Sequence, residues 1–100
     1  MKVRLKVRLT PAAARELQSL PPQVRSRLKK ALAQLSTDPF GRKAGLDVKR
    51  LRSPQVPEVV YRARVGGWRV VYLVRGSMVA VVRIFARDEG YGWMERFRFL

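Results

Sequence analysis

The chain has 100 residues, enough for one domain over residues 1–100, and 47% of them are hydrophobic, which argues against intrinsic disorder. Its 22 Lys and Arg exceed its 7 Asp and Glu by 15 charges, an imbalance typical of proteins that bind polyanions such as nucleic acids or acidic proteins. The lack of Cys and His excludes disulfides, thiolate nucleophiles and the commonest metal ligand and general base, so we expect no cofactor and no metal. Without a long apolar run or a secretory leader, we expect a cytoplasmic protein with no membrane partner.

The first elements are a strand and two helices. Lys2 to Leu9 alternate strictly between charged and apolar residues, which predicts a strand buried on one side. Thr10 and Pro11 form a typical helix start, with a hydroxyl at the N-cap and a proline in the first turn. Helical spacing then predicts one helix to about Leu20 and a second over residues 22–36, joined as an αα-hairpin.

The rest of the chain is predicted to be a loop followed by a β-meander. Residues 40–57 contain several Gly and Pro and are expected to form a loop. Strands are predicted over residues 58–65, 68–74 and 78–86. The Gly66-Gly67 pair predicts a two-residue hairpin turn in which both positions need positive φ. A last short helix is expected within residues 91–100, where Trp93, Met94 and Phe97 recur at helical spacing.

One face of the meander is apolar and needs a cover. Its members are Val59, Tyr61, Ala63, Val65, Trp68, Val70, Tyr72 and Val74. The two amphipathic helices can supply that cover, so the predicted fold class is α+β: an antiparallel-dominated sheet of about four strands with the N-terminal αα-hairpin packed on one face. The N-terminal strand is expected to join the sheet, parallel to a C-terminal strand.

The opposite face is expected to be solvated and rich in arginine. A Gly66-Gly67 turn places Arg64 opposite Arg69 and puts Arg62 on the same face. Like charges across a ladder destabilise the pair, and few acidic residues are available to compensate them. We therefore expect this face to bind an anion.

The register of the second hairpin is less constrained by the sequence. A three-residue turn over residues 75–77 would place Arg69 opposite Arg83 and bring Arg87 to the same face, with Ala80, Val82 and Ile84 under the helices. A two-residue turn would instead place Arg69 opposite Val82 or Ile84. The three-residue turn is preferred because it gathers the charges on the solvated face.

Several motifs in this order resemble those of the RelE/ParE toxin superfamily, and more closely its RelE-type mRNA interferases. They are Thr10-Pro11-Ala12, Leu35-Ser36-Thr37-Asp38-Pro39, Leu51, Tyr61-Arg62-Ala63-Arg64-Val65-Gly66, Trp68-Arg69-Val70-Val71-Tyr72 and Arg87-Asp88-Glu89-Gly90-Tyr91. The resemblance implies a RelE-like fold and a ribosome-dependent endoribonuclease that cleaves mRNA without a metal. It also implies an acidic antitoxin that holds the toxin inactive.

The resemblance also suggests the site residues. It implies catalytic roles for Arg64, Arg69, Arg87 and Tyr91, with Arg69 on the scissile phosphate and Tyr91 stacked on a base, and it pairs Arg62 with Arg64 as a basic pair. From their charge and position, Lys49, Arg50 and Arg83 are expected to bind RNA together with Arg62. RelE-type toxins carry lysines where this chain has Arg62 and Arg64. Since arginine does not lose its proton, the sequence contains no convincing general base.

Two alternative functions remain open at this level. One is a ParE-like inhibitor of DNA gyrase that acts by protein binding and has no nuclease chemistry. The other is a basic RNA-binding module without catalysis. Tyr91 is also consistent with a plain packing role, and the apolar stripe of residues 93–97 is consistent with a groove for an antitoxin helix.

Overall fold

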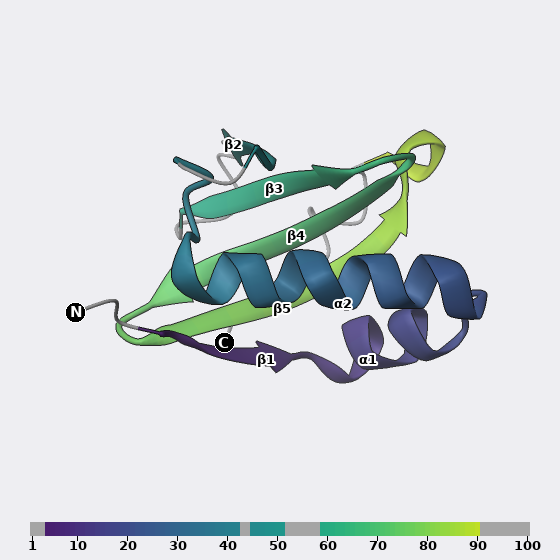
Figure 1. Cartoon of the computed structure of the whole chain (residues 1–100), viewed down its shortest axis with the longest axis horizontal. Helices are drawn as coiled ribbons and strands as arrows, with labels where there is room; N and C mark the ends of the chain where they lie inside the picture. The colour runs from purple at the N-terminus through teal and green to yellow at the C-terminus, as the bar shows by residue number, and fades with distance from the viewer. Residues whose placement is uncertain (1–3, 43–44, 52–58, 91–100) are drawn as a thin grey trace.

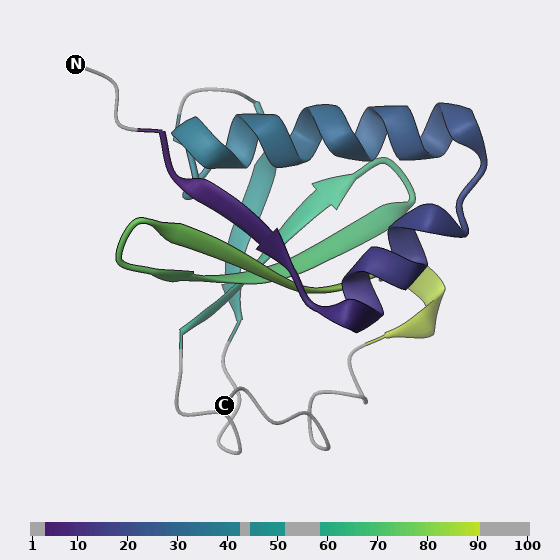
Figure 2. The same cartoon turned by 90° about the horizontal axis from the view of Figure 1, so that it is seen from below.

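The computed structural model describes residues 4–42, 45–51 and 59–90. In chain order the elements are β1 (Lys6–Leu9), α1 (Pro11–Gln18), α2 (Pro22–Thr37), β2 (Asp47–Leu51), β3 (Val60–Val65), β4 (Trp68–Arg75), β5 (Met78–Ala86) and the short 3-10 helix η1 (Arg87–Glu89). Both helices pack on the same side of one sheet (Figure 1), and the turned view shows α2 running along the sheet, apart from the strands (Figure 2). The predicted α+β class is confirmed, with five strands where about four were expected.

The sheet has the strand order β1-β5-β4-β3-β2. β1 pairs with β5 in parallel, as expected for a strand that returns to the sheet after the helical hairpin. The other three neighbouring pairs are antiparallel. The most apolar strands, β4 and β5, are therefore paired on both sides, and the more charged β1 and β2 form the edges.

The start of α1 is fixed both to its own backbone and to β5. The Thr10 hydroxyl accepts a hydrogen bond from the Ala13 N–H at 3.1 Å, which is the predicted N-cap. The same hydroxyl donates to the Val82 carbonyl at 2.7 Å. Because one side chain makes both bonds, the first turn of the helical hairpin is tied to the middle of β5.

The main core lies between the helices and the sheet. From the sheet it contains Ala63, Val65, Val70, Tyr72, Val79, Val81 and Ile84, and from the helices it contains Ala13, Leu17, Leu28, Ala31, Leu32 and Leu35. Most of the predicted apolar face is therefore covered as expected. Val59 is the exception, since it is 40% exposed.

The other face of the sheet carries a second apolar cluster, which the sequence analysis did not predict. Val60, Val71, Leu73, Val82 and Phe85 are all at most 4% exposed and pack together on this face. The expectation of a solvated, arginine-rich face is therefore wrong over this part. Arg62, Arg64 and Arg69 of this face lie toward the end of the sheet at the β3–β4 turn, whereas Arg75 shares the face at the other end of β4.

β2 corrects the prediction of a loop over residues 40–57. Asp47, Lys49 and Arg50 have low strand propensity, which hides the strand in the sequence. Val48, however, packs against the main core while its charged neighbours face away from it. A short, charged strand of this kind is typical of a sheet edge.

The second hairpin also differs from the prediction. Arg75 pairs with Met78, so the turn has two residues rather than three, and Gly76 adopts φ 55° within it. A β-bulge follows: Tyr72 pairs with Val81 but Val71 pairs with Arg83, which leaves Val82 as an additional residue on β5.

The bulge explains why both expected registers for Arg69 are wrong. Arg69 lies opposite Phe85, and not opposite Arg83, Val82 or Ile84. Ile84 still reaches the helix side as expected, whereas Ala80 and Val82 belong to the other face. The additional residue thus lets β5 supply Ile84 to one apolar cluster and Phe85 to the other.

The helix expected within residues 91–100 lies outside the described residues. Among the helices of the described ranges, none combines the length and apolar character needed to span a membrane.

Candidate functional site

The first hairpin has the register that the sequence predicts. Arg64 lies opposite Arg69, and Val65 lies opposite Trp68 at the turn. Gly66 has φ 61°, a conformation that favours glycine, but Gly67 lies outside the left-handed region. The expectation that both turn positions need positive φ is therefore wrong for Gly67, while the two-residue turn itself is confirmed.

β2 adds a third strand to the arginine face. Its register places Asp47 opposite Arg64 and Lys49 opposite Arg62. The three strands surround a hollow of about 300 Å³, which we call the basic hollow and which is lined by Lys49, Leu51, Arg62, Arg64 and Arg69. The structure thus brings four of the eight predicted site residues together.

Arg69 is the most rigidly held member of the basic hollow. It is only 9% exposed, and its Nη1 donates to the carbonyls of Gly66 at 3.1 Å and Trp68 at 3.0 Å. No described residue accepts a hydrogen bond from its Nε or Nη2. A guanidinium that is held through Nη1 and keeps donors on Nε and Nη2 suits bidentate recognition of a phosphate.

Asp47 partly compensates the cations, which corrects the expectation that they lack acidic neighbours. Its Oδ2 lies 3.3 Å from Nη1 of Arg64 and 3.6 Å from Nη1 of Arg62, and its carbonyl accepts from Arg62 at 3.3 Å. The side chain of Asp47 is 56% exposed. One carboxylate against the four cations of the basic hollow leaves an excess of three positive charges.

Arg87 lies beside the same turn. It is the first residue of η1, it is exposed, and its N–H donates to the Gly67 carbonyl at 3.0 Å. This bond joins the end of β5 to the Gly66-Gly67 turn, in which the Gly66 carbonyl accepts a hydrogen bond from Arg69. Arg87 is therefore adjacent to the basic hollow without lining it. Tyr91 lies outside the described residues.

Arg50 is on the other face of the sheet from Lys49. It lies opposite Tyr61, and side chains alternate along β2, so Arg50 is turned toward the helix side and does not line the basic hollow. Lys49 thus lines the basic hollow and Arg50 does not, and RNA binding by either residue stays a prediction.

Arg83 belongs to a different cluster at the junction of α1 and β5. Its Nε and Nη2 donate to the Glu16 carboxylate over 2.7–3.0 Å, and Nη2 also donates to Glu89 at 2.9 Å. Glu16 accepts from the Ile84 N–H at 2.9 Å as well. The hydrogen bond to Glu16 raises the pKa of Arg83 further above its usual value.

Sequence reasoning missed Asp47 because it missed the strand that carries it. With β2 recognised, the register would have placed Asp47 against Arg64, 17 residues along the chain. Within the described ranges, no three His, Cys, Asp or Glu residues gather to form a metal site.

Comparison with known proteins places this chain in a family. The family model of the ParE toxin of the type II toxin–antitoxin system parDE matches residues 7–91. A curated relative from Methanocaldococcus jannaschii, named "Putative toxin RelE1", is 34% identical over 77 residues, which are 76% of this chain and 81% of the relative.

Solved structures agree with that assignment. The archaeal RelE–RelB complex from Pyrococcus horikoshii matches 90% of this chain and 100% of its own with 26% identity and a TM-score of 0.71. The RelBE2 toxin–antitoxin complex from Mycobacterium tuberculosis matches 85% of this chain and 100% of its own with 28% identity and a TM-score of 0.69. The isolated Escherichia coli RelE toxin, 23% identical, shares the fold over 92% of this chain and 94% of its own with a TM-score of 0.63. The chain therefore belongs to the RelE/ParE superfamily of toxins from type II toxin–antitoxin systems.

Proposed function

We propose that this toxin is a ribosome-dependent mRNA endonuclease of the cytoplasm and that the basic hollow binds the scissile phosphate. The observation that carries the proposal is the excess of three positive charges around Arg69, which is held in place by two carbonyls. Uncompensated cations that share one face destabilise the free protein, and an RNA phosphate relieves that repulsion.

The proposed chemistry is metal-independent cleavage by the RNA's own 2′-hydroxyl. The 2′-oxygen bonds to phosphorus, the bond from phosphorus to the 5′-oxygen breaks, and the 5′-oxygen leaves with a proton taken from solvent water. Arg69 and Arg64 stabilise the charge that develops on the phosphorane oxygens, and Arg87 lies next to the leaving oxygen. Tyr91 stacks on a neighbouring base.

No arginine of the basic hollow acts as the general base, because guanidinium groups stay protonated at neutral pH. The 2′-hydroxyl proton passes to solvent in this scheme. The rate enhancement then rests on electrostatic stabilisation and on holding the RNA in the reactive geometry, to which the ribosome contributes.

We further propose an acidic antitoxin as the partner that neutralises the toxin. The Pyrococcus horikoshii and Mycobacterium tuberculosis relatives were solved as complexes with RelB-type antitoxins. A net charge of +15 favours an acidic protein in that role.

Primer extension on mRNA with purified toxin and ribosomes tests the proposal. Wild-type protein should produce cuts at the ribosomal A site, and Arg69→Ala and Arg87→Ala should each reduce cutting at least tenfold, which is about 1.4 kcal/mol of barrier. Arg50→Ala is the matched control, since it removes an exposed arginine from outside the basic hollow and should leave cutting unchanged. Equal cutting by wild type and Arg69→Ala would contradict the proposed site.

Inhibition of DNA gyrase is the second candidate function, because the matching family model is that of ParE toxins. It predicts no cuts in the same assay together with inhibition of supercoiling by the purified protein. RNA binding without cuts and without gyrase inhibition would instead identify a non-catalytic RNA-binding module.

A further inference from the structure

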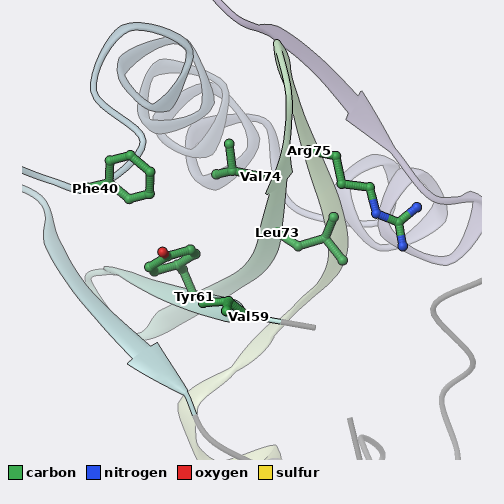
Figure 3. Close-up of a pocket in the computed structure, with 6 residues that line it drawn as sticks. All are labelled: Phe40, Val59, Tyr61, Leu73, Val74 and Arg75. Carbon is green, nitrogen blue, oxygen red and sulfur yellow. The ribbon is translucent and has the colours of Figure 1, made fainter. Parts of the chain in front are cut away.

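A pocket of about 400 Å³ lies at the end of β3 and β4 that is remote from the basic hollow. Figure 3 shows its walls: Phe40 from the segment after α2, Val59 just before β3, Tyr61 from the start of β3, and Leu73, Val74 and Arg75 from the end of β4. We call it the apolar pocket, since five of these six side chains are hydrophobic or aromatic.

Exposed apolar surface is concentrated at this pocket. Among the described residues, the two large hydrophobic side chains that remain exposed are Phe40 at 41% and Val59 at 40%, and both line it. Isolated exposed apolar residues need no explanation, but two that share one concave site suggest a binding surface.

The walls of the apolar pocket are fixed before any partner binds. Tyr61 stacks on Tyr72 with ring centroids 5.8 Å apart, and Phe40 meets Tyr61 edge to face at 5.3 Å. The buried Tyr72 hydroxyl donates to the Pro39 carbonyl at 2.6 Å, and burial raises the pKa of Tyr72 above its usual range, so the phenol stays protonated. The Asp38 carboxylate accepts from the Arg42 N–H at 2.9 Å, which secures the other side of Phe40.

Two cations, Arg42 and Arg75, lie at the apolar pocket. The Arg42 guanidinium lies 5.6 Å from the centre of the Phe40 ring, and Arg75 forms part of the wall with its guanidinium extending away from the aromatic rings (Figure 3). An apolar pocket with a cationic rim fits an apolar side chain that is flanked by carboxylates. A second copy of this chain is a poor occupant, since each copy carries a net charge of +15.

We propose that the apolar pocket anchors a bulky apolar or aromatic side chain of an acidic antitoxin segment. The inference rests on the antitoxin partner of the proposed function and adds the place where that partner is held. Large apolar side chains that fill preformed pockets dominate the binding energy of many protein interfaces.

The anchor acts away from the proposed chemistry. Val74 is five residues from Arg69 along β4, which corresponds to about 17 Å of extended strand. Figure 1 shows the same separation, with the β3–β4 turn at the upper right and the opposite ends of both strands at the left, near the C-terminal end of α2. Changes at the apolar pocket should therefore weaken antitoxin binding and leave RNA cleavage intact.

The test measures both properties in one set of variants. The probe is the purified protein encoded beside the toxin gene, and its affinity for the toxin is measured by titration calorimetry. Val59→Lys and Phe40→Ala should each weaken binding at least tenfold, mainly through faster dissociation. Ala14→Lys is the matched control for Val59→Lys, because it adds the same charge at an exposed position of α1, and it should leave the affinity unchanged.

The outcomes separate this inference from the proposed function. Antitoxin-free Val59→Lys should cut mRNA on ribosomes as wild type does, and a matching thermal unfolding curve shows that it folds. If wild type cuts and binds the antitoxin but Val59→Lys binds equally well, the anchor is wrong and the proposed function stands. Dimers of the wild type that Val59→Lys abolishes would identify a second copy as the occupant and overturn the inference. If wild type neither cuts nor binds, the proposed function itself fails.

Discussion

Two arginine clusters of this protein have opposite charge balances. The basic hollow has four cations, Lys49, Arg62, Arg64 and Arg69, and one carboxylate, that of Asp47, which contacts Arg62 and Arg64. At the α1–β5 junction, the single guanidinium of Arg83 is shared by two carboxylates, Glu16 and Glu89. The sequence alone does not distinguish these arginines. The number of carboxylates for each cation shows which cluster still attracts an anion and which cluster is already neutralised.

The two clusters also differ in what they hold together. Glu16 accepts a hydrogen bond from the Ile84 N–H as well as from Arg83. Since β1 pairs with β5 only as far as Val81, the Glu16 carboxylate binds a backbone N–H of β5 that β1 does not reach. The Arg83 cluster therefore joins α1 to the sheet. The RNA-binding role expected for Arg83 stays a prediction, and its contacts favour a structural role.

The largest expected effect comes from breaking the Arg83 cluster. Arg83→Ala should lower the free energy of unfolding by about 2 kcal/mol, because the side chain of Glu16, only 24% exposed, loses its ionic partner. Urea unfolding followed by circular dichroism measures the change, and Arg50→Ala serves as the control with an exposed arginine removed. If Arg83→Ala kept full stability but lost mRNA cutting, Arg83 would belong to the RNA-binding site, and the proposed difference between the two clusters would be wrong.

A smaller effect is expected from removing the carboxylate of the basic hollow. Asp47→Asn should tighten the binding of single-stranded RNA by about threefold at low salt, because a phosphate no longer competes with Asp47 for Arg62 and Arg64. Fluorescence anisotropy with a labelled oligoribonucleotide measures the affinity.

Glu89→Gln is the control for Asp47→Asn, since it removes one exposed carboxylate from the Arg83 cluster and changes the net charge equally. Equal tightening by both variants would mean that only the overall charge matters, and the basic hollow would then have no special role in RNA binding.

The smallest expected effect concerns the salt dependence of RNA binding. Each cation that displaces a counterion from single-stranded RNA contributes about 0.7 to the slope of log affinity against log salt concentration. Arg64→Ala should therefore reduce that slope by about 0.7, and Arg83→Ala should leave it unchanged. Anisotropy titrations across a salt series give both slopes, and identical slopes for the two variants would show that the clusters do not differ toward RNA.

The parts of the site that local chemistry dictates could be predicted from the sequence. A Gly-Gly turn fixes its hairpin register, so the placement of Arg64 opposite Arg69 followed directly from Gly66-Gly67. The start of α1 followed from Thr10 and Pro11 in the same way.

The parts that depend on distant contacts could not be predicted. The bulge at Val82 adds a residue to β5, and no local turn signal marks it, so the register of Arg69 and Arg83 was wrong. β2 is stabilised by its pairing with β3 and not by the propensity of its own residues, so Asp47 was not expected beside Arg64. The apolar pocket needs Phe40 and Val74 to meet, and they are far apart in the chain.

The additional residue on β5 also predicts how this toxin tolerates changes in chain length. Val82 is the residue of the bulge, so deleting it would leave a regular ladder in which Arg83, Ile84 and Phe85 keep their partners on β4. Ile84 would stay on the helix side and Phe85 on the opposite face, and the second apolar cluster would lose one valine side chain. We therefore expect this toxin to tolerate the loss of Val82 better than the loss of Ile84, which would remove a buried side chain from the main core.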